Sequence, residues 1–173
     1  DEIKEAISNQ AWNAVMESNL TVLLFDGSEE LNNEDLNIIS RLRKLSKEFV
    51  TVINKIDKKS ISSIKEDLHK NGIINMIEIS AEHSTNLNIL KSELEKGLSE
   101  ISIDVPDGKK VAILGRPNAG KSTFINKLIN EERLIVSEIA GTTIDAISIP
   151  FEFNDENFIL IDTAGIRKGY KYN

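Results

Sequence analysis

The chain has 173 residues, of which 40% are hydrophobic and 28% charged, and it carries a formal net charge of −7 at pH 7. This length and composition fit one globular domain with a sizeable core, or pieces of two. The negative charge argues against a surface that coats nucleic acid generally, although it is compatible with a local basic patch.

Cysteine and long apolar runs are both absent from the sequence. Without cysteine the chain has no disulfide, thiolate metal site or thiol nucleophile, which suits a reducing compartment. No apolar run approaches the roughly 20 residues of a membrane-spanning helix, and no signal peptide opens the chain. We therefore expect a cytoplasmic protein without a membrane partner. Because the chain begins at Asp1 rather than at Met, we also expect it to be part of something longer.

The first 98 residues alternate between helical and strand patterns. Apolar residues recur at helical spacing over 2–18, and the continuous apolar run 20–25 is typical of a buried parallel strand. The alternation then continues with a helix that Asn33 can cap, a strand at 49–53, a helix at 61–70, a strand at 73–79 and a helix at 86–99.

Residues 99–110 interrupt this alternation and contain Pro106-Asp107-Gly108, so they are the best candidate for a linker. Beyond them the patterns predict a strand at 110–114, a helix at 122–130 and a hairpin formed by 146–153 and 157–162. Strands alternating with helices indicate an α/β fold, with a mostly parallel sheet flanked by helices and one antiparallel edge from the hairpin. Ligands of such sheets bind at the carboxyl ends of strands, where four motifs fall: 54–57, 80–81, 115–122 and 162–165.

Residues 115–122 read Gly-Arg-Pro-Asn-Ala-Gly-Lys-Ser, between an apolar strand and a helix, which is the context of a phosphate-binding loop. Its terminal glycines let backbone N–H groups surround a phosphate, and the following helix adds its partly positive N-terminus. Lys121 can reach the terminal phosphates. The side chain of Asn118 can either help to bind a monovalent cation or brace the loop. We expect the nucleotide phosphates to contact Gly115, Arg116, Pro117, Asn118, Ala119, Gly120, Lys121, Ser122 and Thr123.

Asp162-Thr163-Ala164-Gly165 ends the last predicted strand, where a carboxylate can hold Mg²⁺ through water and Gly165 leaves a backbone N–H free to approach a γ-phosphate. Thr142 and Thr143 lie in the loop that would cover that phosphate, and one of them is expected to bind Mg²⁺, although the sequence does not say which. The expected metal ligands are therefore Ser122, Thr142, Thr143 and Asp162. The expected catalytic residues are Lys121, Thr142, Thr143 and Gly165, and the nucleotide contacts extend over Thr163, Ala164 and Ile166.

Asn54-Lys55-Ile56-Asp57 suits a guanine reader. The carboxylate of Asp57 can accept two hydrogen bonds from guanine, from the ring N1–H and the exocyclic amine, whereas adenine offers no such pair of donors. Asn54 can contact the base N7 or brace the phosphate loop, and the stem of Lys55 can lie along the ring face. After the next strand, a backbone N–H of Ser80-Ala81 can reach the guanine oxygen. The expected base-binding set is Asn54, Lys55, Ile56, Asp57, Ser80, Ala81 and Glu82.

Together these motifs resemble those of the Der (EngA) family of bacterial double GTPases, whose domains are P-loop NTPases with a Ras-like G-domain fold. Residues 115–123, 141–147 and 162–168 resemble the opening half of that family's second G domain. Residues 54–57 and 80–83 resemble the closing half of its first. We expect GTP/GDP and Mg²⁺ as cofactors, with K⁺ as a further one bound through Asn118. The resemblance implies the large ribosomal subunit, with its rRNA and proteins, as the partner during assembly. Der proteins often carry Arg where this chain has Ile144.

The motif order is permuted, because the base-reading motifs precede the phosphate loop. Three explanations fit this order. The chain is part of two domains of a Der-like protein, or it is a naturally permuted GTPase like the RsgA and RbgA families, or it is an artificially permuted one. The motif spellings favour the first or the third explanation. Each motif occurs once, so we predict one composite G domain, with 1–98 as its closing half, 99–110 as linker and 111–173 as its opening half. It forms within one chain or by exchange of halves in a dimer.

The resemblance implies hydrolysis of the β–γ bond of GTP by water, with loop amides, Lys121 and Mg²⁺ stabilising the charge on the transferring phosphoryl group. Ile166 occupies the position of the water-orienting Gln of Ras-like enzymes, so we expect slow intrinsic turnover that K⁺ or a partner raises. The rival interpretations are a nucleotide-dependent binding module with negligible hydrolysis, and an ATPase. The guanine motif counts against the ATPase.

Overall fold

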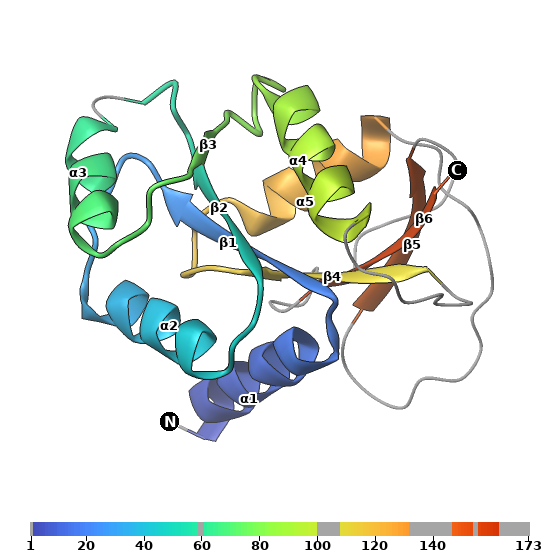
Figure 1. The fold of residues 1–173 in the computed structure, drawn as a ribbon, viewed down its shortest axis with the longest axis horizontal. Helices are drawn as coiled ribbons and strands as arrows, with labels where there is room; N and C mark the ends of the chain where they lie inside the picture. The colour runs from blue at the N-terminus through green and yellow to red at the C-terminus, as the bar shows by residue number, and fades with distance from the viewer. Residues whose placement is uncertain (1, 59–60, 100–107, 132–146, 154–155, 163–173) are drawn as a thin grey trace.

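In the computed structural model, six strands form a single sheet with the order β3-β2-β1-β4-β6-β5 (Figure 1). The structure describes residues 2–58, 61–99, 108–131, 147–153 and 156–162. The strands are β1 Leu20–Asp26, β2 Phe49–Asn54, β3 Ile77–Glu78, β4 Lys109–Leu114, β5 Ile147–Phe153 and β6 Glu156–Asp162. The described helices are α1 Glu2–Glu17, α2 Asn33–Lys44, α3 Ser62–Lys70, α4 Leu87–Ser99 and α5 Lys121–Glu131.

The central pair of the sheet joins the two halves of the sequence, on either side of the expected linker. β1 pairs with β4 in parallel, in a register that runs from Leu20 opposite Val111 to Leu23 opposite Leu114. β4 also pairs in parallel with β6, while β5 is antiparallel to β6, as expected for the hairpin. The loop after β4 therefore lies beside the carboxyl ends of β1 and β2.

Two apolar cores cover the two faces of this sheet because neighbouring strand residues point to opposite faces. On β1, Val22 packs in the core that contains α4 and α5, whereas Leu23 packs in the core that contains α1, α2 and α3. Figure 1 shows this three-layer arrangement, with the sheet between the two groups of helices. Phe124 of α5 and Leu42 of α2 are fully buried in these cores. The predicted α/β class is confirmed.

Some predicted element boundaries were wrong. The helix cap is Asn32 rather than Asn33, because its side chain accepts from the backbone of Glu34 and Asp35 and the Asp35 side chain accepts in return. Asn33 has Leu36 three residues later and cannot form this reciprocal capping box.

The strand expected at 73–79 shrinks to Ile77–Glu78, since the chain leaves α3 through Gly72 at a positive φ of 75° and pairs with β2 only at its end. β4 begins at Lys109, inside the expected linker, and α5 begins at Lys121, one residue earlier than expected. None of the helices in the described ranges is long and apolar enough to cross a membrane.

Candidate nucleotide-binding site

The phosphate loop is a tight turn into which the first half of the chain packs closely. A Cβ atom on Gly115 would lie 2.3 Å from the carbonyl oxygen of Leu24 on β1. Gly120 has a φ of +93°, and a Cβ atom there would lie 2.3 Å from the side-chain nitrogen of Asn54. Both glycines are therefore required by contacts with the first 98 residues as well as by the turn itself.

Lys121 lies over the loop rather than away from it. Its ammonium group donates to the carbonyl oxygens of Gly115 and Arg116, both at 2.7 Å. The residue is buried, at the first position of α5, and the exposed Ser122 and Thr123 follow it in the first turn. A cation and a helix N-terminus thus meet at the loop, which is the electrostatic arrangement that favours a phosphate.

Asn54 braces the phosphate loop, one of the two roles that its motif allows. Its side-chain nitrogen donates to the carbonyl of Ala119 at 3.0 Å, and its side-chain oxygen accepts from the backbone N–H of Ala81 at 2.9 Å. The side chain is buried. One amide therefore holds together the loop and both segments of the expected base site, and in this structure it takes the N–H of Ala81 that we had expected to reach guanine.

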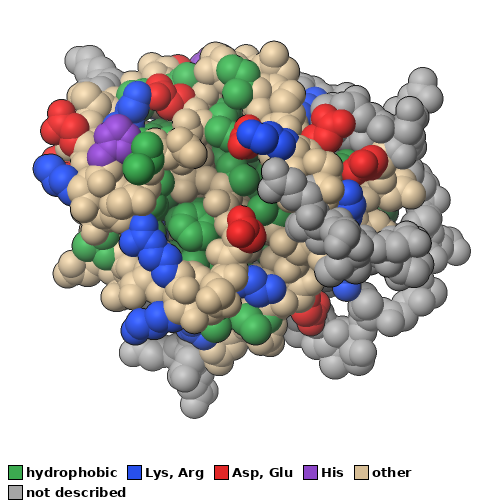
Figure 2. Space-filling model, viewed as in Figure 1, with side chains coloured by type: hydrophobic (Ala, Val, Ile, Leu, Met, Phe, Trp, Pro, Cys, Tyr) green, Lys and Arg blue, Asp and Glu red, His purple; other side chains and the backbone are tan. Residues whose placement is uncertain are grey.

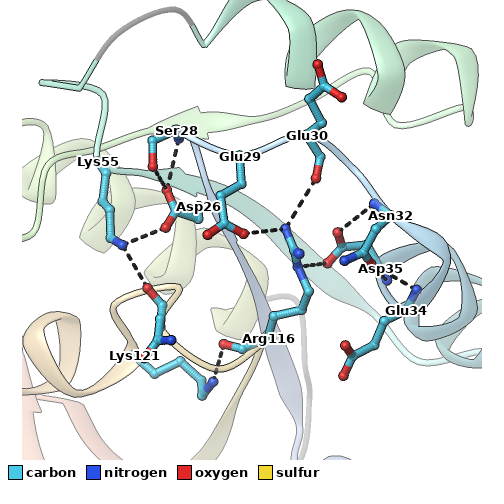
Figure 3. A network of polar contacts seen from close by, with 11 residues as sticks. Asp26, Ser28, Glu29, Glu30, Asn32, Glu34, Asp35, Lys55, Arg116 and Lys121 are labelled. Atoms are coloured by element: carbon cyan, nitrogen blue, oxygen red, sulfur yellow. Dashed lines mark hydrogen bonds and ion pairs between the residues drawn. The ribbon is translucent and has the colours of Figure 1, made fainter.

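Lys55 adds a second link between the base-reading motif, residues 54–57, and the phosphate loop (Figure 3). Its ammonium group donates to the carbonyl of Asn118 at 2.8 Å and to the carboxylate of Asp26 at 2.5 Å. Asp26 is buried at the end of β1 and also accepts from the backbone and hydroxyl of Ser28. Burial raises the pKa of Asp26, but the hydrogen bonds from Lys55 and Ser28 outweigh it and hold the pKa below its ordinary value.

Asp57, the expected guanine reader, is exposed at the edge of this network. The buried hydroxyl of Ser80 donates to one carboxylate oxygen at 2.5 Å, and the imidazole of His83 lies 3.7 Å from the other. The hydrogen bond from Ser80 is the main cause that lowers the pKa of Asp57. The side chain is thus an oriented carboxylate at neutral pH, the form that accepts hydrogen bonds from guanine.

Arg116 is the loop residue that turns away from Lys121. Figure 3 shows its guanidinium reaching toward the segment that leads into α2, where it pairs with Asp35 at 2.9 Å and Glu29 at 3.1 Å. Of the other expected loop residues, Pro117 and Asn118 are exposed and Ala119 is buried.

The remaining predicted residues, Thr142, Thr143, Thr163, Ala164, Gly165 and Ile166, lie outside the described residues. Asp162 is described through its backbone, which ends β6 in register with Ile113 of β4.

The sequence interpretation missed Asp26, Glu29 and Asp35. For Asp26 a signal was available, because it is a carboxylate directly after the buried parallel strand predicted at 20–25.

A sheet with a phosphate loop after its central strand, and a base-reading motif after a neighbouring strand, defines a class: this is the fold of a P-loop NTPase with the Ras-like G-domain arrangement. Residues 110–173 match a family model described as "50S ribosome-binding GTPase". In sequence the chain is similar to GTPase Der.

The similarity to GTPase Der extends along almost the whole chain. The identity to GTPase Der of Aquifex aeolicus is 38% over 169 residues, which cover 97% of this chain and 39% of that protein. It is also 38% to GTPase Der of Legionella pneumophila (strain Corby), over 96% of this chain and 37% of that protein. The chain thus spans well under half the length of these relatives.

Among solved structures, that of YjeQ from Thermotoga maritima is similar with a TM-score of 0.52 and 18% sequence identity, covering 84% of this chain and 47% of that one. At this identity the likeness concerns the fold alone.

Proposed function

We propose that this chain binds GTP and GDP and, with Mg²⁺, hydrolyses GTP to GDP and phosphate. The observation that carries the proposal is the direct bonding of the base-reading motif to the phosphate loop. Asn54 donates to the carbonyl of Ala119, and Lys55 donates to the carbonyl of Asn118. A guanine nucleotide needs its base and its phosphates held at a fixed separation, and these two bonds supply that separation.

We further propose that residues 1–98 and 111–173 act as the two halves of one composite G domain. The pairing of β1 with β4 supports this, as do the two bonds that Asn19 forms with the backbone of Lys110, both 2.8 Å long. The same arrangement by exchange of halves between two chains would give a dimer with two such sites.

The similarity to GTPase Der supports an origin of the permuted order in a Der-like protein, because it continues across the linker and over 97% of the chain. The alternative is a permuted GTPase of the RsgA/RbgA type, and the likeness to YjeQ is compatible with it.

In the proposed reaction the loop amides bind the phosphates and Lys121 neutralises charge on them, while Asp57 fixes the base. The hydroxyl of Ser122 suits Mg²⁺, which prefers oxygen ligands, and Thr142 or Thr143 and Asp162 are proposed to join it. Bound Mg²⁺ would supply charge neutralisation at the β- and γ-phosphates. With Ile166 after Gly165 we propose slow intrinsic hydrolysis that K⁺, through Asn118, or a partner accelerates.

The proposed biological setting is a cytoplasmic switch in assembly of the large ribosomal subunit, with rRNA and ribosomal proteins as partners. Its support is the description of the matched family model. On the face shown in Figure 2, the Lys and Arg side chains of the described residues are interspersed with Asp and Glu, so that face gives no separate support for RNA contact.

Three assays on the purified chain test this proposal. Displacement of a fluorescent GDP analogue by GTP but not by ATP tests the guanine site, and equal displacement by ATP would favour the ATPase. Single-turnover hydrolysis of radiolabelled GTP then separates an enzyme from a binding module. Phosphate release in K⁺ faster than in Na⁺, and lost in Asn118→Ala, would support the potassium proposal; no cation preference in the parent would contradict it.

A further inference from the structure

The guanidinium of Arg116 is held by three acceptors, two from the segment before α2 and one from the first turn of α2. Its Nε donates to the carboxylate of Asp35 at 2.9 Å, and a terminal nitrogen contacts the carboxylate of Glu29 at 3.1 Å and the carbonyl of Glu30 at 3.3 Å. The Arg116 side chain is only 15% exposed. A phosphate-loop residue is thus fixed from outside the loop, by the half of the chain that carries the base motif.

Asp35 performs two tasks with its two oxygens. One pairs with Arg116, and the other accepts from the backbone N–H of Asn32 at 3.1 Å to close the capping box of α2. Its side chain is 3% exposed. Burial raises the pKa of Asp35, opposed by the bond from Asn32 and by the charge of Arg116. A carboxylate in such a place needs a cation beside it, and Arg116 is the cation that lies there.

The contact continues into the loop through the backbone of Arg116. The carbonyl oxygen of Arg116 accepts from the ammonium group of Lys121 at 2.7 Å. Fixing the Arg116 side chain therefore fixes one of the two carbonyls that position Lys121. The pairing also neutralises the guanidinium and turns it toward Asp35 (Figure 3), away from the place where Lys121 meets the helix N-terminus.

We infer that Asp35 is a positioning residue for nucleotide phosphates. It acts through Arg116, because holding this side chain fixes the start of the phosphate loop and thereby the position of Lys121. The inference rests on the proposed function, because it presumes that the loop binds a guanine nucleotide. The competing explanation is that Asp35 only caps α2. The two explanations predict different results for the cap residue Asn32, which shares the capping box but contacts neither Arg116 nor the loop in the described bonds.

The test compares the variants Asp35→Ala and Asn32→Ala with the parent chain by displacement of a fluorescent GDP analogue. The measured quantity is the ratio of the dissociation constants of GMP and GDP, which reports the binding contributed by the β-phosphate. We expect Asp35→Ala to reduce this ratio about tenfold, the size of a lost charge-assisted interaction, and Asn32→Ala to leave it within about twofold. Adding Asp35→Ala to Arg116→Ala should change this ratio no further, since both substitutions remove the same contact between Arg116 and Asp35.

Thermal unfolding of each variant accompanies the titrations. If Asp35→Ala does not fold, Asp35→Asn, which keeps the size of the side chain, is compared with Asn32→Ala in the same way. An unchanged ratio in the folded Asp35 variant, or an equal loss in Asn32→Ala, overturns the inference and leaves the proposed function standing. A parent chain that does not bind GDP overturns the proposed function itself.

Discussion

The side-chain amide of Asn54 donates to the carbonyl of Ala119 at 3.0 Å, across a separation of 65 residues. The same amide accepts from Ala81, so a single buried side chain connects three loops from three strand ends. Both partner residues are buried. Together with Lys55, Asn54 therefore links the base-reading motif to the phosphate loop.

Replacing Asn54 should affect both stability and binding. Asn54→Ala leaves the Ala81 N–H and the Ala119 carbonyl without these partners, so we expect a loss of about 1–3 kcal/mol in the free energy of unfolding. GDP affinity should fall with it, because the base motif and the loop lose a link. Urea unfolding and GDP titration measure the two effects. Asn88→Ala, on the exposed face of α4, is the matched control. Equal behaviour of the two variants would contradict the bracing role.

Base selectivity should depend on Asp57. In Asp57→Asn an amide nitrogen replaces one acceptor, so guanine loses a partner while xanthine, which carries an oxygen in place of the exocyclic amine, gains one. We expect GDP affinity to fall tenfold or more, with xanthosine diphosphate becoming the better ligand. Competition titrations with both nucleotides measure this. The control Asp67→Asn changes a carboxylate on α3 that pairs only with nearby Lys70 in the described contacts. Unchanged GDP affinity in Asp57→Asn would rule out the assignment.

Two glycine substitutions should have opposite effects. Gly120→Ala places a Cβ 2.3 Å from the Asn54 side chain at a φ of +93°, so we expect loss of GDP binding and lower stability. Gly97→Ala, within α4, brings its Cβ to 3.4 Å from a methyl group of Leu20, an ordinary contact. Helix propensity should then stabilise that variant by about 0.5–1 kcal/mol. Thermal unfolding of both tests the pair, and a tolerated Gly120→Ala would mean that the loop is not packed against Asn54.

The buried carboxylate of Asp26 should make part of the stability dependent on pH. Its folded-state pKa lies below the ordinary value of 3.8, so the ionised form stabilises the fold above pH 3.8, and the contribution disappears as pH falls through the folded-state pKa. We expect the parent to exceed Asp26→Asn in unfolding free energy at neutral pH and the difference to shrink as the pH falls below 3.8. Urea unfolding over this range measures it, with Glu93→Gln as control. A difference that grows in acid would have the wrong sign.

Local sequence signals predicted the elements that carry the candidate site. The phosphate loop, its strand and its helix follow from residues 109–131, and Asn54 and Asp57 are recognisable from their own tetrapeptide. The contacts between these motifs were harder to predict from the sequence. The choice of Asn54 between base and loop, and the pairing of Arg116 with Asp35, depend on which strands become neighbours, and that is decided by packing of both sheet faces.

One wrongly predicted helix boundary could have been avoided by a closer inspection of the residue spacing. Asn32 has an acidic residue three positions later and Asn33 does not, which distinguishes the true cap. β3 could not be delimited in this way. Ile73 and Ile74 look like strand residues, yet Ile73 is buried outside the sheet and Ile74 is 78% exposed.

We propose that the base-reading half and the phosphate-loop half of this chain form one guanine-nucleotide site. Equilibrium titration of a fluorescent GDP analogue into the chain, with competition by GDP and ADP, tests it most directly. We predict one analogue bound per chain, displaced by GDP and not by ADP, with binding lost in Lys121→Ala and weakened tenfold or more in Asp57→Asn. Absence of binding, or displacement by ADP as readily as by GDP, would contradict the claim.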